Sequence, residues 1–132
     1  MDNKQLAYFL ARITLGINLF IHGLVRIPKL EAFANGIIKG FEDSMLPEIL
    51  VTPIAYAIPF IEGILGIFLL FGVLARKTLI GAAIFMIILI AGSAFKEDWG
   101  TVGTQMLYSL YIFFLIFYQE HELRAIFSKK KN

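Results

Sequence analysis

The 132 residues suffice for one domain, and 58% of them are hydrophobic, with a mean hydropathy of +0.76. This composition lies outside the range of soluble globular domains, so we predict an integral membrane protein formed as a single domain over 1–132. The formal charge of +2 says little by itself, and the absence of cysteine excludes internal disulfides, thiolate nucleophiles, Cys-ligated zinc and iron–sulfur clusters.

The first hydrophobic run, over about 6–27, is predicted to be a membrane-spanning helix. At helical spacing, Asn18, His22 and Arg26 follow one stripe of this helix, and Arg12 lies beside it. Ionisable groups at membrane depth are expensive and normally turn toward a partner or a cavity. We therefore expect this stripe to face the interior of a helix bundle.

The next segment, over 29–45, is too short and too polar to span a bilayer. Its apolar residues recur at helical spacing against charged ones, which predicts an amphipathic helix that lies in the interface or folds over the bundle. Gly36 and Gly40 weaken such a helix, so a broken or re-entrant form is the alternative.

Three later hydrophobic runs predict spans over about 52–74, 79–95 and 102–118. Pro59 should bend the first of these three helices. The triplet 75–77, Ala-Arg-Lys, is predicted to form a tight basic turn. The expected fold class is all-α: a four-transmembrane-helix bundle with an amphipathic interfacial helix between its first and second spans.

The distribution of Lys and Arg predicts the orientation, because cytoplasmic loops carry an excess of both. With the N-terminus inside, Lys4, the triplet 75–77 and the basic tail 119–132 are cytoplasmic, where the tail either continues the last helix or lies along the anionic leaflet. Both termini should thus be cytoplasmic, in a bacterial inner membrane. We expect the first run to remain as a helix and not to be cleaved as a signal peptide, because charged residues separate it from the small residues at 32–34. The cationic residues left on the outer side are Lys29, Lys39 and Lys96.

Glu62 is the only acidic residue within the three later hydrophobic runs. At 1.5 Å per residue it lies about 18 Å from the inner boundary, level with Asn18 and within side-chain reach of His22. We therefore predict that Glu62 meets the polar stripe of the first span. Two interpretations follow: these groups lock the first two spans together, or they line a polar pocket.

Such a pocket would open toward the outer leaflet and accept a polar head like that of a quinone. A carboxylate and an imidazole would be available there for proton transfer, although no residue is assigned a catalytic role. The candidate ligand-binding residues are Arg12, Asn18, His22, Arg26, Glu62, Tyr56 and Tyr108.

Several other ligands are disfavoured. A haem held by two histidines would need His22 and His121, which are predicted to lie in opposite leaflets. One histidine and one glutamate form a poor transition-metal site, so no metal is expected. The basic tail beside a membrane span is a determinant of topology, so we expect no nucleic acid as a partner.

The order and spacing of several short motifs resemble the DoxX-like family, a group of small four-helix membrane proteins. The resemblance covers about 11–94, although the Gly-rich tail with a terminal acid that is common in the family is replaced here by 119–132. The motifs are Arg12-x-x-x-Gly16, His22-Gly23 with Arg26, Glu62-Gly63 with Gly66, and Gly72 followed by Arg76.

The resemblance implies the fold more strongly than an activity, because some relatives are linked to thiosulfate–quinone oxidoreduction and others to oxidoreductase complexes, methylamine utilisation or receptor assembly. Two hypotheses remain. One is a redox-associated membrane subunit whose pocket binds a quinone-type or small anionic ligand. The other is a non-enzymatic scaffold in the lipid bilayer that works through helix–helix contacts with a partner subunit or a second copy. A transporter is less favoured, since no inverted repeat is visible.

Overall fold

The computed structural model describes residues 2–122, and these residues form five α-helices and two short 3₁₀ turns. The α-helices are α1 (Asn3–Arg26), α2 (Leu30–Gly40), α3 (Glu48–Phe71), α4 (Ala75–Phe95) and α5 (Trp99–Phe117). The 3₁₀ turns are η1 (Ile27–Lys29), between α1 and α2, and η2 (Gln119–His121), after α5. Four helical segments, α1 with its continuation into α2, α3, α4 and α5, are long and apolar enough to cross a membrane. The all-α, four-span fold predicted from the sequence is therefore confirmed.

Local sequence signals account for the ends of these helices. Asp2 caps α1 and exchanges hydrogen bonds with Gln5, in the reciprocal arrangement of a capping box. Pro28 lies two residues after the end of α1, inside η1, where the chain turns into α2. Asp98 caps α5 by accepting hydrogen bonds from the backbone and the hydroxyl of Thr101, and these hydrogen bonds hold the pKa of the Asp98 carboxyl below its usual value.

Several boundaries differ from the predicted ones. Helix α2 ends at Gly40, before the predicted end at 45, and α5 begins at Trp99, before the predicted start at 102. The triplet 75–77 is not a turn: it forms the first turn of α4. The actual turn is 72–74, because Gly72 adopts a left-handed conformation at the end of α3 and Leu74 adopts another at the start of α4. Helix α3 begins at Glu48, about one turn before the predicted start at 52, because Pro47 supplies the extended residue from which a helix starts.

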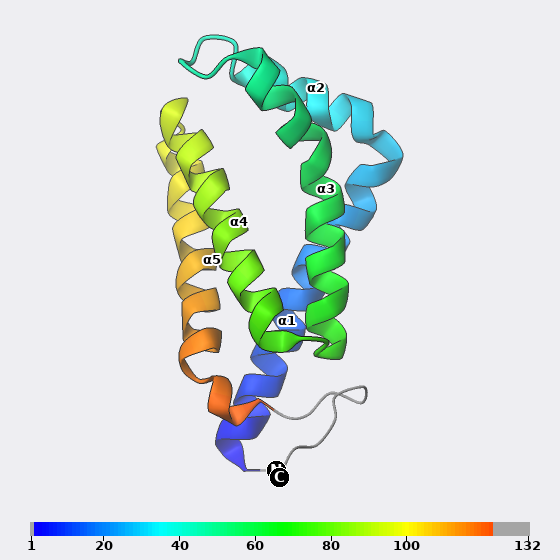
Figure 1. Ribbon diagram of the computed structural model, residues 1–132, viewed down its shortest axis with the longest axis vertical. Helices are drawn as coiled ribbons and strands as arrows, with labels where there is room; N and C mark the ends of the chain where they lie inside the picture. The colour runs from blue at the N-terminus through cyan, green and yellow to red at the C-terminus, as the bar shows by residue number, and fades with distance from the viewer. Residues whose placement is uncertain (1, 123–132) are drawn as a thin grey trace.

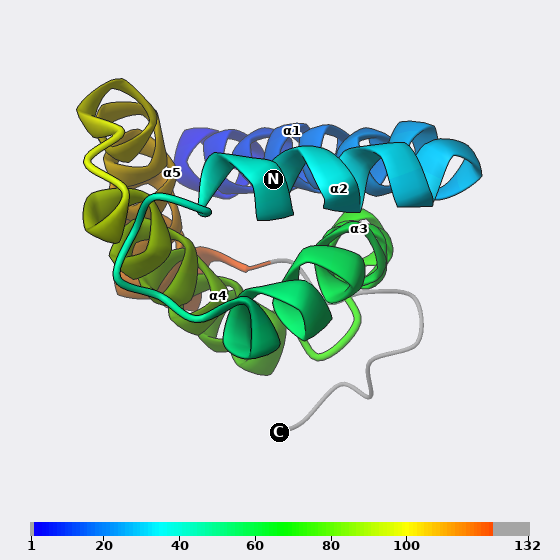
Figure 2. The ribbon, with the colours of Figure 1, turned by 90° about the horizontal axis from the view of Figure 1, so that it is seen from above.

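The helices are arranged as two pairs. Helix α1 packs along α3, and α4 packs along α5 (Figure 1). One end of the bundle, here called the terminal end, carries the start of α1, the turn between α3 and α4, and η2. The other end, here called the α2 end, carries α2, the loop 41–47 and the turn between α4 and α5; seen from above, α2 and this loop lie across it (Figure 2). Helix α3 changes direction along its length, as expected of a helix that contains Pro53 and Pro59.

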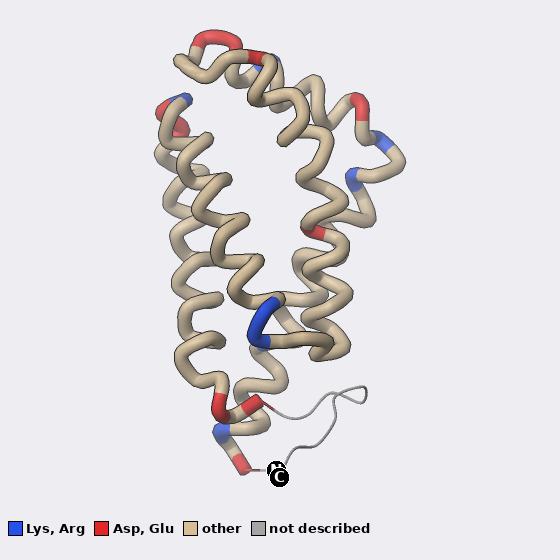
Figure 3. Tube along the Cα trace, viewed as in Figure 1, with Lys and Arg blue, Asp and Glu red and all other residues tan. Residues whose placement is uncertain are grey.

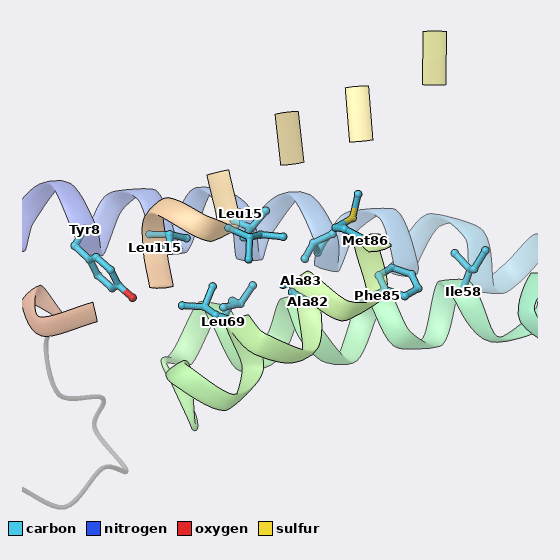
Figure 4. Packing of buried hydrophobic residues seen from close by; sticks show 12 residues of the cluster. Tyr8, Leu15, Ile58, Leu69, Ala82, Ala83, Phe85, Met86 and Leu115 are labelled. Carbon is cyan, nitrogen blue, oxygen red and sulfur yellow. The ribbon is translucent and has the colours of Figure 1, made fainter. Parts of the chain in front are cut away.

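The buried core lies where α1, α3, α4 and α5 converge. Leu69 and Leu79 are fully buried, and Ile112 of α5 joins them. Leu15, Leu69 and Leu115 lie near one another in this core (Figure 4). Outward-facing positions on all four long helices carry large exposed apolar side chains, as expected of surfaces that contact lipid. Because this core is concentrated near the terminal end and the middle, the two helix pairs leave room between them toward the α2 end.

Candidate functional site

Close contact between α1 and α3 positions the polar stripe. A Cβ atom added to Gly66 would lie 2.3 Å from the Phe20 nitrogen, and one added to Gly23 would lie 2.4 Å from the Pro59 carbonyl oxygen. Only glycine permits this approach of two backbones, as small residues do in membrane bundles. The side chains that follow Gly23 on α1 are thereby held beside the middle of α3.

At this level Glu62 of α3 and Arg26 of α1 form an ion pair. The Arg26 Nη1 atom donates a hydrogen bond of 2.9 Å to Glu62 Oε1. The Glu62 side chain is 8% exposed, and that of Arg26 is 29% exposed. Arg26 also lies over the ring of Phe33 from α2, with 4.5 Å between its guanidinium carbon and the ring centroid. The single intramembrane acid thus meets the stripe of the first span, and its partner is Arg26.

Two further residues of the stripe connect α1 with α5. Asn18 Nδ2 donates a hydrogen bond of 2.6 Å to the Tyr108 hydroxyl. His22 Nδ1 lies 2.7 Å from the carbonyl oxygen of Asn18, one helical turn earlier. Because a carbonyl oxygen only accepts, this contact requires the proton on Nδ1. In the neutral ring Nε2 is then an unprotonated acceptor.

These side chains lie at a cavity of about 690 Å³ between the two helix pairs. His22, Arg26 and Glu62 line it from α1 and α3, and Tyr108 and Gln105 line it from α5. Its remaining walls are mostly apolar side chains of α2, α3 and α4. Wall residues such as Leu50, Ile54, Ile87 and Ile88 are also exposed on the lipid-facing surface, so the cavity reaches this surface between α3 and α4.

The cavity is covered at the α2 end by two aromatic residues, each of which meets a cation from another part of the chain. Phe33 meets Arg26, as described above, and the Lys96 ammonium lies 4.9 Å from the centroid of the Phe41 ring. A Cβ atom on Gly92 of α4 would lie 3.4 Å from the same Phe41 ring. Sequence reasoning placed both Phe residues on the apolar side of an amphipathic helix, but it did not connect them with Arg26 or Lys96.

Arg12 lies elsewhere, in a second buried cluster at the terminal end. Its guanidinium donates hydrogen bonds to the carbonyl oxygens of Leu69 and Leu70 at the end of α3, and its Nε atom lies 3.3 Å from Glu122 Oε1. Tyr8 donates a hydrogen bond of 3.1 Å to Gln119 of η2. Burial raises the pKa of the Glu122 carboxyl above its ordinary value, although Arg12 opposes this shift.

Of the seven candidate residues, the structure thus brings His22, Arg26, Glu62 and Tyr108 to one cavity. Asn18 stands behind them and holds Tyr108, whereas Arg12 and Tyr56 do not line the cavity. The part of the chain that the structure describes contains no group of three or more His, Cys, Asp or Glu residues that could hold a metal ion. His121 lies in η2 at the terminal end, far along the bundle from His22 (Figure 1).

The fold and the cavity define a small α-helical integral membrane protein with a polar intramembrane site. The model of the DoxX family matches residues 7–95, about two thirds of the chain, and the chain therefore belongs to the DoxX family. The match ends with α4, so it includes His22, Arg26 and Glu62 but not Tyr108 of α5. No curated protein and no solved structure matches the chain.

Proposed function

We propose that this DoxX protein binds the polar ring of a quinone-type lipid in the cavity between its helix pairs, as a redox-associated membrane subunit. The observation that carries the proposal is the placement of one ion pair, one imidazole and one phenol at a cavity whose other walls are mostly apolar and reach the lipid-facing surface. Ligand cavities commonly combine apolar walls with a few converging polar groups. A quinone has the matching form, with a polar ring and an apolar tail.

The size and access of the cavity support an amphipathic ligand over a small anion. A volume of about 690 Å³ falls within the range of cavities that hold drug-sized molecules. The ring would lie beside Arg26 and Glu62, and the tail would leave between α3 and α4 into the bilayer. Such a lipid needs no aqueous route, because the bilayer itself delivers it.

The test is the ligand content of the full-length protein purified from quinone-replete membranes. We expect co-purifying quinone in the wild-type protein and a smaller amount in Glu62→Gln and Tyr108→Phe. The matched controls are Glu48→Gln and Tyr56→Phe, which change the same residue types outside the cavity and should keep the ligand. Wild-type protein without quinone and without measurable affinity for it would reject the proposal.

A second candidate follows from the same ion pair. Because Arg26 and Glu62 join α1 to α3 directly, these residues also suit a non-enzymatic scaffold that assembles with a partner subunit or a second copy. In that case Glu62→Gln lowers thermal stability, or releases a co-purifying protein, without changing lipid content. Thermal unfolding measured beside the quinone content of each variant distinguishes the two functions.

We also propose that the terminal end faces the cytoplasm of a bacterial inner membrane, with both termini inside. Lys4, Arg76 and Lys77 lie at this end (Figure 3), and the sequence of the tail 119–132 adds further Lys and Arg residues. The cavity then lies toward the outer side of the membrane, beneath α2.

A further inference from the structure

Some of the polar atoms that face the cavity have hydrogen-bond partners, and others have none. Arg26 occupies Oε1 of Glu62, whereas Oε2 has no hydrogen bond to any described residue. His22 uses Nδ1 on the Asn18 carbonyl, and its Nε2 likewise has no partner within 2–122. Both side chains line the cavity. Beside the ion pair the site therefore offers two acceptors, a carboxylate oxygen and an imidazole nitrogen, to whatever enters. On α5, the side-chain oxygen of Gln105 is a further buried acceptor without a partner among the described residues.

Donors are available beside these acceptors. Asn18 donates to the Tyr108 oxygen, so the Tyr108 phenol proton is not used in that contact. Arg26 has five N–H groups, and Nη1 makes its hydrogen bond to Glu62. A ligand head that only accepts hydrogen bonds would satisfy the donors and leave both acceptors unpaired. A head that carries hydroxyl groups would satisfy both kinds of group.

A quinone and its reduced quinol differ in this property while they share a ring and a tail. The carbonyl oxygens of a quinone accept only, whereas each quinol hydroxyl donates one hydrogen bond and can also accept. A polar group that is buried without a partner is costly, so the unpaired acceptors disfavour the quinone. The effect is strongest in a cavity with mostly apolar walls, where little water competes.

We infer that the cavity selects the reduced, hydroxyl-bearing form: it is a quinol site in which His22 Nε2 and Glu62 Oε2 accept the ring hydroxyls. This inference rests on the proposed function and adds to it the form of the lipid that the protein holds. We expect the quinol to bind about tenfold more tightly than the quinone.

Three probes of nearly equal shape test the inference on the purified full-length protein in detergent, under anaerobic conditions. They are a short-chain ubiquinol, the corresponding ubiquinone, and the dimethyl ether of the quinol, which keeps the ring but has no donor. The wild-type protein should bind the quinol about tenfold more tightly than either of the others. In His22→Met the preference for the quinol should fall to about threefold, because Glu62 Oε2 still accepts one hydroxyl, while the affinity for the quinone changes less than about twofold.

The chain offers a matched control, because its second histidine lies outside the cavity. His121→Met should keep the full preference for the quinol. Glu62→Gln provides a second variant of nearly unchanged shape; its amide can donate to a carbonyl, so the preference should shrink or reverse.

The outcomes separate the inference from the proposed function. If wild-type protein binds the quinone or the dimethyl ether as tightly as the quinol, the quinol preference is rejected and the quinone-type site stands. Survival of the full preference in both His22→Met and Glu62→Gln would also reject the assignment of these two acceptors and leave the quinone-type site standing. If none of the three probes binds, the proposed function is rejected as well.

Discussion

The ion pair between Arg26 and Glu62 is unequal in burial. The carboxylate is almost entirely covered, whereas the guanidinium keeps 29% of its side chain exposed at the cavity and rests on Phe33. Removing the cation therefore leaves a buried carboxylate without its partner, which costs more than the pair itself contributes. Removing the carboxylate leaves a cation that can still reach polar surroundings.

This asymmetry gives a prediction for a double-mutant cycle. Arg26→Met should lower the free energy of unfolding by about 2 kcal/mol, below the usual range for a broken buried pair because Arg26 is partly exposed. Adding Glu62→Leu to Arg26→Met should restore part of this loss. Thermal unfolding in detergent measures each step, with Arg76→Met as an exposed control that changes stability by less than about 0.5 kcal/mol. If the loss of stability in the double variant equals the sum of the losses in Arg26→Met and Glu62→Leu, the two side chains are not coupled.

The partner of Glu62 could be predicted from the sequence, but only as a group. Helical spacing put Asn18, His22 and Arg26 on one stripe, and a single acid in the later spans had to meet it. Depth counted along the helices favoured Asn18 as the nearest residue, whereas the observed partner is Arg26. The count assumed that both helices start at one boundary, whereas their contact places Gly23 beside Gly63, so Glu62 lies about one turn closer to Arg26 than assumed.

The partners of Arg12 could not be predicted in the same way. It belongs to the stripe by spacing, yet its guanidinium pairs with Glu122 and with carbonyl oxygens at the end of α3. Carbonyl acceptors leave no signal in a sequence, because every residue has one. Glu122 follows the last span in a charged segment without hydrophobic periodicity, so no pattern connected it with α1.

Among the elements, the contact of α1 with α3 depends on Gly23 and Gly66. Alanine at Gly66 would place its Cβ 2.3 Å from the Phe20 nitrogen and 2.6 Å from the Phe20 Cα, so the two helices would have to separate. Backbone atoms cannot move aside as a flexible side chain can. The Arg26–Glu62 pair lies along the same contact and would lengthen with it.

We therefore predict that Gly66→Ala destabilises the protein by about 3 kcal/mol, at the upper end of the cost of overpacking. Gly36→Ala and Gly103→Ala are matched controls, because nothing lies within 4 Å of a Cβ at either position. Both lie inside helices, where alanine is favoured over glycine by about 1 kcal/mol, so these variants should be neutral or more stable. Equal melting temperatures for Gly66→Ala and the controls would show that α1 and α3 are not held this closely.

The short turn η2 gives a prediction about pH. Burial raises the pKa of Glu122 and Arg12 opposes the shift, so the folded state holds this proton more tightly than the unfolded state. The protonated Glu122 carboxyl contributes fully to the free energy of unfolding at a pH below the ordinary carboxyl pKa. This contribution is lost as the pH rises through the raised pKa of the folded state. Unfolding of wild-type protein and Glu122→Gln should be compared between about pH 4.5 and about pH 8. The wild type should lose stability relative to the variant as the pH rises, and a constant difference would contradict the shift.

Helix ends were predictable only where a residue acts on its own helix. Pro28 ends α1, and Gly72 provides the left-handed residue that ends α3. The basic triplet 75–77 was misplaced as a turn because charge suggested a loop, while the chain had already reversed at 72–74. Its charged side chains instead lie in the first turn of α4, at the membrane boundary.

At the scale of the whole molecule, the two ends of the bundle differ in their connections and in their charges. The terminal end carries Lys4, Arg76 and Lys77, and the α2 end carries its cations among acidic residues of the loop 41–47 and the turn 96–98 (Figure 3). Cytoplasmic segments are selected by Lys and Arg, with little contribution from acids. The sequence that follows η2 contains Arg124 and three further lysines.

The orientation can be tested directly, because the chain contains no cysteine and each introduced thiol is the only one present. Asp43→Cys lies in the exposed loop at the α2 end, and Glu120→Cys lies in η2 at the terminal end. In intact bacterial cells, a membrane-impermeant thiol reagent should label the first variant and not the second. Inverted membrane vesicles should show the opposite pattern, and solubilised protein should be labelled at both sites. The reverse result in intact cells would place the cavity toward the cytoplasm, so that a bound lipid would exchange protons with the inner compartment instead of the outer one.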